Sequence, residues 1–125
     1  MDKELIQNIS EEELYEKMKH QSIPFVVIFY ASWCPKSKQL LEIVPEIIQK
    51  YQEKVKFLKI EVEGKKKGEI TSRKIHDFCK IKDYPVISLF YLGIFLGMVL
   101  SQKDRDGQIG DLERIIQNAS VYFPR

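Results

Sequence analysis

Residues 25–40 have the sequence FVVIFYASWCPKSKQL, and this stretch carries the strongest structural signal in the chain. Its first part belongs to an apolar run of β-branched and aromatic residues, residues 23–30, which is typical of a strand buried on both faces. Its second part opens a helix predicted over residues 35–51, because the apolar residues there recur with helical spacing. We therefore expect a central strand that is followed by a short polar turn and then by a long amphipathic helix.

The chain on either side of this stretch alternates between strand-like and helix-like segments. A strand predicted over residues 55–62 would complete a right-handed βαβ unit with parallel strands. Residues 85–91 and 94–101 are expected to form an antiparallel hairpin. The other predicted elements are a short opening strand containing Leu5, Ile6 and Ile9, a helix that Ser10 and Glu13 cap and that ends near His20, and helices over residues 69–79 and 109–119. This order predicts an α/β fold with a mixed central sheet and helices on both faces.

Length and composition fit one domain, which we expect to span residues 1–125. Apolar residues make up 44% and charged residues 30%, a balance that supports a packed core and argues against disorder. The formal net charge of +2 gives no overall attraction to nucleic acid. No apolar run approaches the roughly 20 residues that cross a bilayer, and the acidic start lacks an apolar export signal. We expect a cytoplasmic protein without nucleic-acid or membrane partners.

Charge is unevenly distributed along the chain. Residues 1–16 contain six acids and one lysine, whereas the segment from Lys65 to Lys82 contains seven basic residues and two acids. Such runs are most often solvated helix and loop surfaces. The alternative is that the basic segment docks an acidic protein partner. It has no interleaved aromatic residues of the kind that bind nucleic acid.

Chemically active residues are concentrated at Trp33-Cys34-Pro35-Lys36-Ser37. Cys34 lies at the predicted start of the long helix, with Pro35 in the first-turn position that proline favours. Free backbone amides, the helix dipole and Lys36 stabilise negative charge there, so this position favours the nucleophilic thiolate form of Cys34. Trp33 offers a flat apolar surface beside the sulfur. The alternative role, a small buried core residue, fits less well because Cys34 falls in a polar turn.

The second cysteine, Cys79, is expected to play a structural role. It follows Phe78 on the predicted apolar face of its helix, so we expect both to pack in the core. Two cysteines are too few for a disulfide scaffold, and a Cys34–Cys79 disulfide is not expected. His20 and His76 have no partners at metal-ligand spacing, so neither a metal nor another cofactor is expected.

The quoted stretch, the strand and helix that follow it, and Tyr84-Pro85-Val86 together resemble the thioredoxin family. That family has a Trp-Cys-Gly-Pro-Cys-Lys site after a buried strand and a cis-proline before a later strand. The resemblance covers about residues 10–119 and implies a thioredoxin-like fold. It also implies that Cys34 is the attacking cysteine, that Pro85 is the cis-proline beside it, and that protein disulfides are the substrates.

Several positions depart from the family pattern. Ser37 stands where the family has its resolving cysteine, and a hydroxyl cannot displace a mixed disulfide, although it can donate a hydrogen bond to the Cys34 thiolate. Ile28 replaces the buried acid that assists proton transfer, whereas the nearby basic position is matched by Lys59. Tyr84 replaces a smaller residue, so its ring is expected to narrow the substrate groove. The groove around the sulfur is expected to comprise Trp33, Pro35, Lys36, Tyr84 and Pro85.

Three functions fit this site, and the first is our hypothesis. Cys34 would attack a protein disulfide or a glutathione mixed disulfide, and an external thiol such as glutathione would resolve the product, as in disulfide isomerisation or deglutathionylation during redox homeostasis. In the second, the domain is a redox-inactive binding module that keeps the groove for partner recognition. In the third, the protein is a dithiol oxidoreductase whose resolving cysteine was changed to Ser37.

Overall fold

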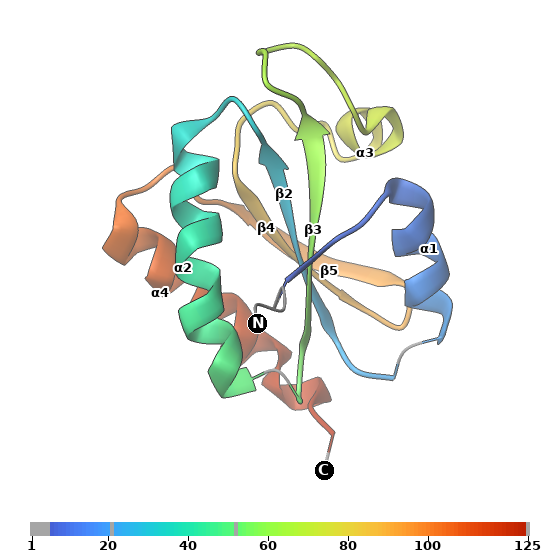
Figure 1. The fold of residues 1–125 in the computed structure, drawn as a ribbon. Helices are drawn as coiled ribbons and strands as arrows, with labels where there is room; N and C mark the ends of the chain where they lie inside the picture. Colours follow the sequence, from blue (N-terminus) through green and yellow to red (C-terminus); the bar gives the residue numbers. More distant parts are fainter. Residues whose placement is uncertain (1–5, 21, 52, 125) are drawn as a thin grey trace, which may run out of the picture.

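The computed structural model describes residues 6–20, 22–51 and 53–124, and its strands and helices follow the predicted order (Figure 1). The elements are β1 (Gln7–Asn8), α1 (Glu11–His20), β2 (Phe25–Ala31), α2 (Pro35–Tyr51), β3 (Lys56–Glu63), α3 (Arg73–Phe78), β4 (Val86–Tyr91), β5 (Ile94–Leu100), α4 (Arg105–Ala119) and the short 3-10 helix η1 (Ser120–Tyr122).

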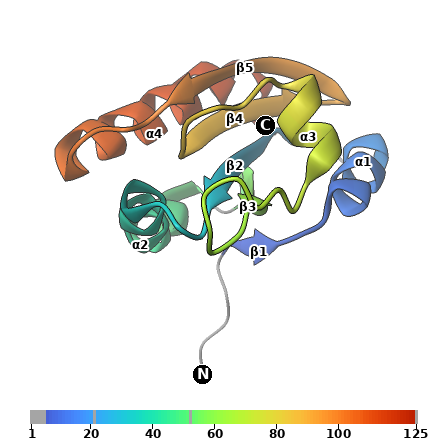
Figure 2. The same ribbon diagram turned by 90° about the horizontal axis from the view of Figure 1, so that it is seen from above.

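The strands form one mixed sheet in the order β1-β3-β2-β4-β5. β1, β3 and β2 run parallel, whereas β4 is antiparallel to β2 and β5 is antiparallel to β4. Figure 2 shows α2 and α4 on one side of the sheet and α1 and α3 on the other. The predicted α/β class, with a mixed sheet and helices on both faces, is therefore confirmed.

Two apolar clusters fill the space between the sheet and its helices. On one face, Leu40 and Val44 of α2 and Leu112 of α4 belong to the same buried cluster as Ile28 of β2. On the other face, α1 and α3 contribute to a second cluster that includes Phe29 of β2. Both clusters use β2, whose side chains alternate between the two faces, and this explains its uninterrupted apolar sequence.

Most elements agree with the prediction to within two residues. The capping box of α1 is formed, because the Ser10 amide donates to Glu13 Oε1 at 2.9 Å and the Glu13 amide donates to Ser10 Oγ at 3.1 Å. The opening strand is limited to β1, between the buried side chains of Ile6 and Ile9. Leu5, which we assigned to that strand, lies outside the described residues.

α3 is shorter than predicted, because residues 69–72 pair with β3 instead of joining the helix. The hydroxyls of Thr71 and Ser72 both donate to the carbonyl of Glu61, and these bonds compete with helix formation. The prediction that Phe78 packs in the core is also wrong, since its side chain is 82% exposed. In α3 the buried residue is Ile75, which packs in the cluster on this face of the sheet.

α4 begins at Arg105, earlier than the predicted start at Ile109. The cause is Asp104, whose carboxylate accepts a hydrogen bond from the Gly107 amide at 2.8 Å and so caps the first turn. Residues 105–108, which precede the predicted start, are therefore helical. Local capping outweighed the low helix propensity of glycine here.

Glu11 connects α1 to α3 through a buried carboxylate. The residue is 7% exposed, and its Oε1 accepts hydrogen bonds from the amides of Lys74 at 2.9 Å and Ile75 at 3.5 Å. These amides belong to the first turn of α3, whose N-cap residue Ser72 makes no side-chain capping bond. Glu11 therefore supplies, from a neighbouring helix, the acceptor and the negative charge that the start of a helix favours.

We expect Glu11→Ala to lower the free energy of unfolding by about 1–2 kcal/mol, because two amides of α3 lose their acceptor. Urea unfolding at neutral pH measures the change. Glu12→Ala is the matched control, since Glu12 lies in the same turn of α1 and is exposed, and its effect should stay within about 0.5 kcal/mol. Equal losses for the two variants would contradict the capping role of Glu11.

Candidate functional site

Cys34 lies in the turn that joins β2 to α2. Its amide donates to the Ala31 carbonyl at 3.1 Å, and its own carbonyl accepts from the amides of Ser37 at 3.1 Å and Lys38 at 3.2 Å. These bonds place Cys34 at the N-terminus of α2, as predicted. The residue is 4% exposed, and its Sγ donates to the carbonyl of Tyr84 at 3.6 Å. The thiol is thus held between the start of a helix and the loop that precedes β4.

The loop before β4 contains a cis peptide bond between Tyr84 and Pro85. In this loop the Tyr84 carbonyl faces Cys34, which lies 50 residues earlier in the sequence. Pro85 itself is buried. The structure therefore brings together the two segments that the resemblance assigns to one site, the Cys34 turn and the Tyr84-Pro85 loop.

Glu63, at the end of β3, is a buried carboxylate beside this site that the sequence pattern did not indicate. It accepts hydrogen bonds from the indole of Trp33 at 2.9 Å, the hydroxyl of Tyr84 at 2.7 Å and the amide of Gly68 at 2.6 Å. Burial alone would disfavour the carboxylate, but these donors outweigh it and lower the pKa of Glu63. Glu63 therefore links the Cys34 turn, the cis-proline loop and the loop after β3.

The ring of Tyr84 does not line an open groove, so that expectation is corrected. Its side chain is 0% exposed, and its ring meets Trp33 edge-on, with centroids 6.2 Å apart and planes at 89°. The hydroxyl needs a hydrogen-bond partner when it is buried, and Glu63 supplies one, so the ring packs beneath Trp33. Burial, together with the hydrogen bond and charge of Glu63, raises the pKa of Tyr84. The hydroxyl consequently stays protonated and acts as a donor.

Ser37 is fully buried in the first turn of α2. The Ala31 amide donates to Ser37 Oγ at 3.2 Å, which ties the start of α2 to the end of β2. A bond from this hydroxyl to the Cys34 sulfur is not among the hydrogen bonds of the described residues. That contact stays a prediction for the thiolate form, in which the sulfur becomes an acceptor.

Ile28, which stands at the position of the family's buried acid, lies within the apolar core. Ile28 is 0% exposed and packs in the cluster beneath α2, where it cannot accept or release a proton. Lys59 lies opposite Ile28 in the register of β2 and β3. Its ammonium is 6.0 Å from the centre of the Tyr30 ring, and its side chain is only partly buried. The structure therefore supplies no carboxylate at position 28 to take a proton from a second thiol.

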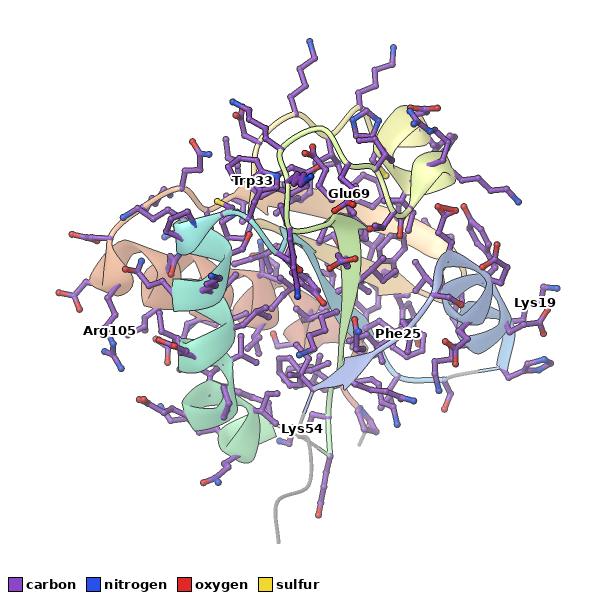
Figure 3. All side chains as sticks on the ribbon, turned by 45° about the horizontal axis from the view of Figure 1, so that its top comes forward. Lys19, Phe25, Trp33, Lys54, Glu69 and Arg105 are labelled. Atoms are coloured by element: carbon purple, nitrogen blue, oxygen red, sulfur yellow. The ribbon has the colours of Figure 1, made fainter. Side chains whose placement is uncertain are left out.

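The rim around Cys34 is apolar and positively charged. Trp33 and Lys36 are partly buried and Pro35 is exposed. The ammonium of Lys67, in the loop after β3, lies 5.5 Å from the centre of the Trp33 ring, within cation–π range. In Figure 3, Trp33 lies at the end of the molecule where several long side chains with blue nitrogen tips project from the loops.

Gln108 of α4 supports the start of α2, and the sequence pattern did not indicate it because it precedes the predicted helix. It is fully buried, and its Nε2 donates to the carbonyls of Lys36 at 3.0 Å and Ser101 at 2.9 Å. Its Oε1 accepts from Gln39 at 3.0 Å. These bonds fix the first turn of α2 against the end of β5.

Both cysteines are free, and the remaining candidates are Cys79 and the two histidines. Cys79 is half-buried beside the α1–α3 cluster, and burial raises the pKa of its thiol. His20 ends α1, and His76 of α3 pairs with Asp77 at 2.8 Å. Within the described residues, no three His, Cys, Asp or Glu side chains form a group that could hold a metal ion. In the same residues, none of the helices is both long and apolar enough to span a bilayer.

We expect Tyr84→Phe to destabilise the protein by about 1.5–3 kcal/mol at neutral pH, because the ionised Glu63 loses a buried donor. A lowered pKa contributes stability above the unfolded-state value and loses it as pH falls through the folded-state value. The difference in free energy of unfolding between the variant and the unmodified protein should therefore shrink as the pH falls below about 4, near the ordinary pKa of a glutamate. Urea unfolding across this range measures it.

Tyr91→Phe is the matched control for this substitution. Tyr91 is partly exposed, and its ring stacks on Tyr122 at 4.4 Å, but its hydroxyl makes no hydrogen bond among those of the described residues. Loss of the Tyr91 hydroxyl should change the free energy of unfolding little at any pH. A Tyr84→Phe effect that stayed constant from neutral to acidic pH would show that Glu63 is not the partner responsible.

Comparison with known proteins gives a family match over most of the chain. Residues 5–107 match the family model for thioredoxin. The thioredoxin of Rickettsia prowazekii (strain Madrid E) is 30% identical over 59 residues, which cover 47% of this chain and 56% of that protein. The chain thus spans little more than half the length of this curated relative.

Solved structures share the fold over most of the chain. Thioredoxin f2 of Chlamydomonas reinhardtii superimposes with a TM-score of 0.72 at 18% identity, covering 90% of this chain and 94% of that one. A chain in a structure on the thiol resolving mechanism of yeast mitochondrial 1-Cys peroxiredoxin, via glutathione/thioredoxin systems, gives 0.65 at 26% identity, covering 86% of this chain and 94% of that one. The family match spans most of the sequence and the fold agrees with it, so the chain belongs to the thioredoxin family.

Proposed function

We propose that this thioredoxin-like redox protein exchanges disulfides through one nucleophilic cysteine, Cys34. The observation that carries the proposal is the pairing of Cys34, at the start of α2, with the carbonyl of Tyr84 in the cis-proline loop. Ser37 occupies the place of a resolving thiol, and its hydroxyl is engaged by Ala31. Thioredoxin-family proteins need no cofactor, so the chemistry rests on the sulfur and on the groups that hold it.

The proposed reaction is two successive thiol–disulfide exchanges. In the first, the Cys34 thiolate attacks one sulfur of a substrate disulfide, the S–S bond breaks, and the other sulfur leaves as a thiolate that takes a proton from solvent. In the second, an external thiolate such as that of glutathione attacks the mixed disulfide at the substrate-derived or the Cys34 sulfur. Attack at the substrate sulfur regenerates Cys34 and leaves the electrons balanced, with one new disulfide formed for each one broken.

Three features near the sulfur would serve this cycle. The helix N-terminus stabilises the thiolate when it forms and when it leaves. The Tyr84 backbone lies beside Cys34, where an extended substrate segment can pair with it as an added strand does. The hydroxyl of Ser37 can donate to the thiolate, but it has no thiol with which to release the substrate. Release therefore falls to the external thiol.

We further propose that the substrates are protein disulfides or glutathione mixed disulfides whose flanking groups are acidic. Lys67 lies over Trp33, and Lys36 lies in the first turn of α2, so positive charge surrounds the approach to Cys34. Lys65 and Lys66, both exposed, extend this charge along the loop. A reducing cytoplasm supplies glutathione as the resolving thiol and is the compartment we propose.

A redox-inactive binding module is the second candidate. It is favoured by the low exposure of Cys34, 4%, and by Ile28 at the position of the proton-transferring acid. The Cys34→Ser variant distinguishes the two functions, because it removes the thiol and keeps the shape of the groove. Loss of exchange with retained substrate binding supports exchange chemistry, whereas unchanged function in cells that lack the native protein supports the binding module.

We expect limited iodoacetamide near neutral pH to modify Cys34 before Cys79. Cys34 lies at the N-terminus of α2, where the helix dipole assists attack by a sulfur nucleophile, whereas burial raises the pKa of the Cys79 thiol and so keeps it protonated. Mass spectrometry of the digested protein measures the two rates. The Cys34→Ser and Cys79→Ser variants assign each rate to its residue. Faster labelling of Cys79 in the folded protein would remove the basis for Cys34 as the nucleophile.

We expect the protein to stall as a Cys34 mixed disulfide when a protein disulfide substrate is added without glutathione. Non-reducing electrophoresis would show the adduct, and dithiothreitol or glutathione would release it. Ser37→Cys should relieve the stall by forming an internal disulfide, although it leaves the Ala31 amide with a poorer acceptor and costs about 1 kcal/mol of stability.

The matched control for Ser37→Cys is Ser37→Ala, which removes the hydroxyl without adding a thiol and should stall as the unmodified protein does. Repeated turnover of an unmodified chain with thioredoxin reductase, in the absence of any other thiol, would contradict the proposal. That cycle requires an internal disulfide, which Cys34 and Ser37 cannot form.

A further inference from the structure

The loop before β4 is anchored on both sides of the carbonyl that faces Cys34. On one side, the hydroxyl of Tyr84 donates to Glu63 Oε2 at 2.7 Å. On the other side, the amide of Ser101 donates to the Pro85 carbonyl at 2.9 Å. Between these bonds, the Tyr84 carbonyl accepts from Cys34 Sγ at 3.6 Å. The position of the backbone beside the sulfur therefore depends on both anchors.

The bond between Tyr84 and Glu63 is the anchor that is made by side chains. The Tyr84 ring is fully buried and meets Trp33 edge-on. A tyrosine side chain is rigid and has few rotatable bonds, so fixing its hydroxyl at one end restricts its backbone at the other. The Glu63 carboxylate, which belongs to the end of β3, thus controls a backbone segment that lies 21 residues later in the sequence.

The turn that holds Cys34 is fixed separately, through the backbone of the same part of β3. The amide of Ser32 donates to the carbonyl of Glu63 and the amide of Trp33 donates to the carbonyl of Gly64, each at 3.0 Å. In Figure 1, the turn after β2 and the loop after β3 both lie at the top of the molecule. A substitution of the Glu63 side chain leaves these backbone groups unchanged. It should therefore disturb the loop before β4 more than the nucleophile.

We propose that Glu63 is a positioning residue for disulfide exchange and that it acts through the hydroxyl of Tyr84. It holds the Tyr84 backbone where an extended peptide pairs with it, and so favours peptide disulfides over small disulfides that have no backbone to pair. This role rests on the exchange chemistry proposed for Cys34 and adds to it the class of substrate.

Two mixed disulfides of thionitrobenzoate test this role. One carries a short neutral peptide with a central cysteine, and the other carries the amino acid cysteine alone. In both, the Cys34 thiolate attacks the cysteine sulfur, the S–S bond breaks, and thionitrobenzoate leaves as a coloured thiolate, because its thiol is the more acidic of the two. The attacked sulfur and the leaving group are the same, so the ratio of the two rate constants measures the contribution of the peptide backbone. Every protein carries Cys79→Ser, so that the colour comes from Cys34.

We expect Tyr84→Phe and Glu63→Ala each to lower the rate constant for the peptide by about tenfold or more, because the loop loses its anchor. The rate constant for cysteine should change much less. The double variant should react no more slowly than Glu63→Ala, because both substitutions remove the same bond. Glu63→Gln should retain most of the peptide rate, since its amide oxygen can accept from Trp33 and its amide nitrogen can donate to the Tyr84 oxygen.

Glu11→Ala is the matched control. Glu11 is also a buried carboxylate that accepts two backbone amides, but it joins α1 to α3. Its loss should lower the free energy of unfolding and leave both rate constants unchanged. Circular dichroism checks that each variant is folded. Should Glu63→Ala fail to fold, Tyr84→Phe and Glu63→Gln decide the question, because each nearly preserves the volume of the original side chain.

Three results would overturn the positioning role. The first is an equal loss of rate for the peptide and for cysteine, which would show an effect on the Cys34 thiol itself. The second is an unchanged peptide rate in Tyr84→Phe. The third is a Glu63→Gln variant that reacts with the peptide as slowly as Tyr84→Phe, which would assign the effect to charge and not to position. In each case the Cys79→Ser parent still exchanges, so the proposed function stands. A parent that reacts with neither disulfide would overturn the exchange function, and this role with it.

Discussion

The burial of β2 on both faces is the constraint on which the rest of the structure depends. Its residues from Phe25 to Phe29 have almost no exposed surface, and they pack alternately against α2 with α4 and against α1 with α3. A strand in this position must lie at the centre of the sheet, and the chain that leaves it must emerge at one edge. The helix that begins there has its N-terminus fixed relative to the whole core, and Cys34 takes its place from that geometry.

The site itself is assembled by hydrogen bonds between loops that are distant in sequence. Glu63 holds Trp33, Tyr84 and Gly68 through one carboxylate, while Gln108 holds the first turn of α2 from the far side. These buried polar groups are mutually satisfied, which makes each of them costly to remove and makes the geometry around the sulfur rigid. These bonds hold the Cys34 turn and the loop before β4 in one arrangement.

Two kinds of surface divide the molecule. The end that carries Trp33 is apolar and positively charged, with Lys67 over the indole ring and Lys36 in the first turn of α2. The α1–α3 side carries an apolar groove whose exposed lining includes Tyr15, Phe78, Phe95 and Met98. The basic segment spans both regions: Lys67 lies over the Trp33 ring, whereas Lys74 lies in the first turn of α3.

The sequence by itself determined the elements whose signals are local. The apolar run of β2, the helical spacing of α2 and the capping box of α1 are each written within about a dozen neighbouring residues, and Cys34 at a helix start follows from two of them. The tertiary structure decided what depends on partners remote in sequence. Glu63 gains its role from Trp33 and Tyr84, the Tyr84 ring turns inward because that carboxylate accepts its hydroxyl, and α3 is shortened by bonds to β3. Hydrogen-bond partners and burial are properties of the folded chain, and no local pattern encodes them.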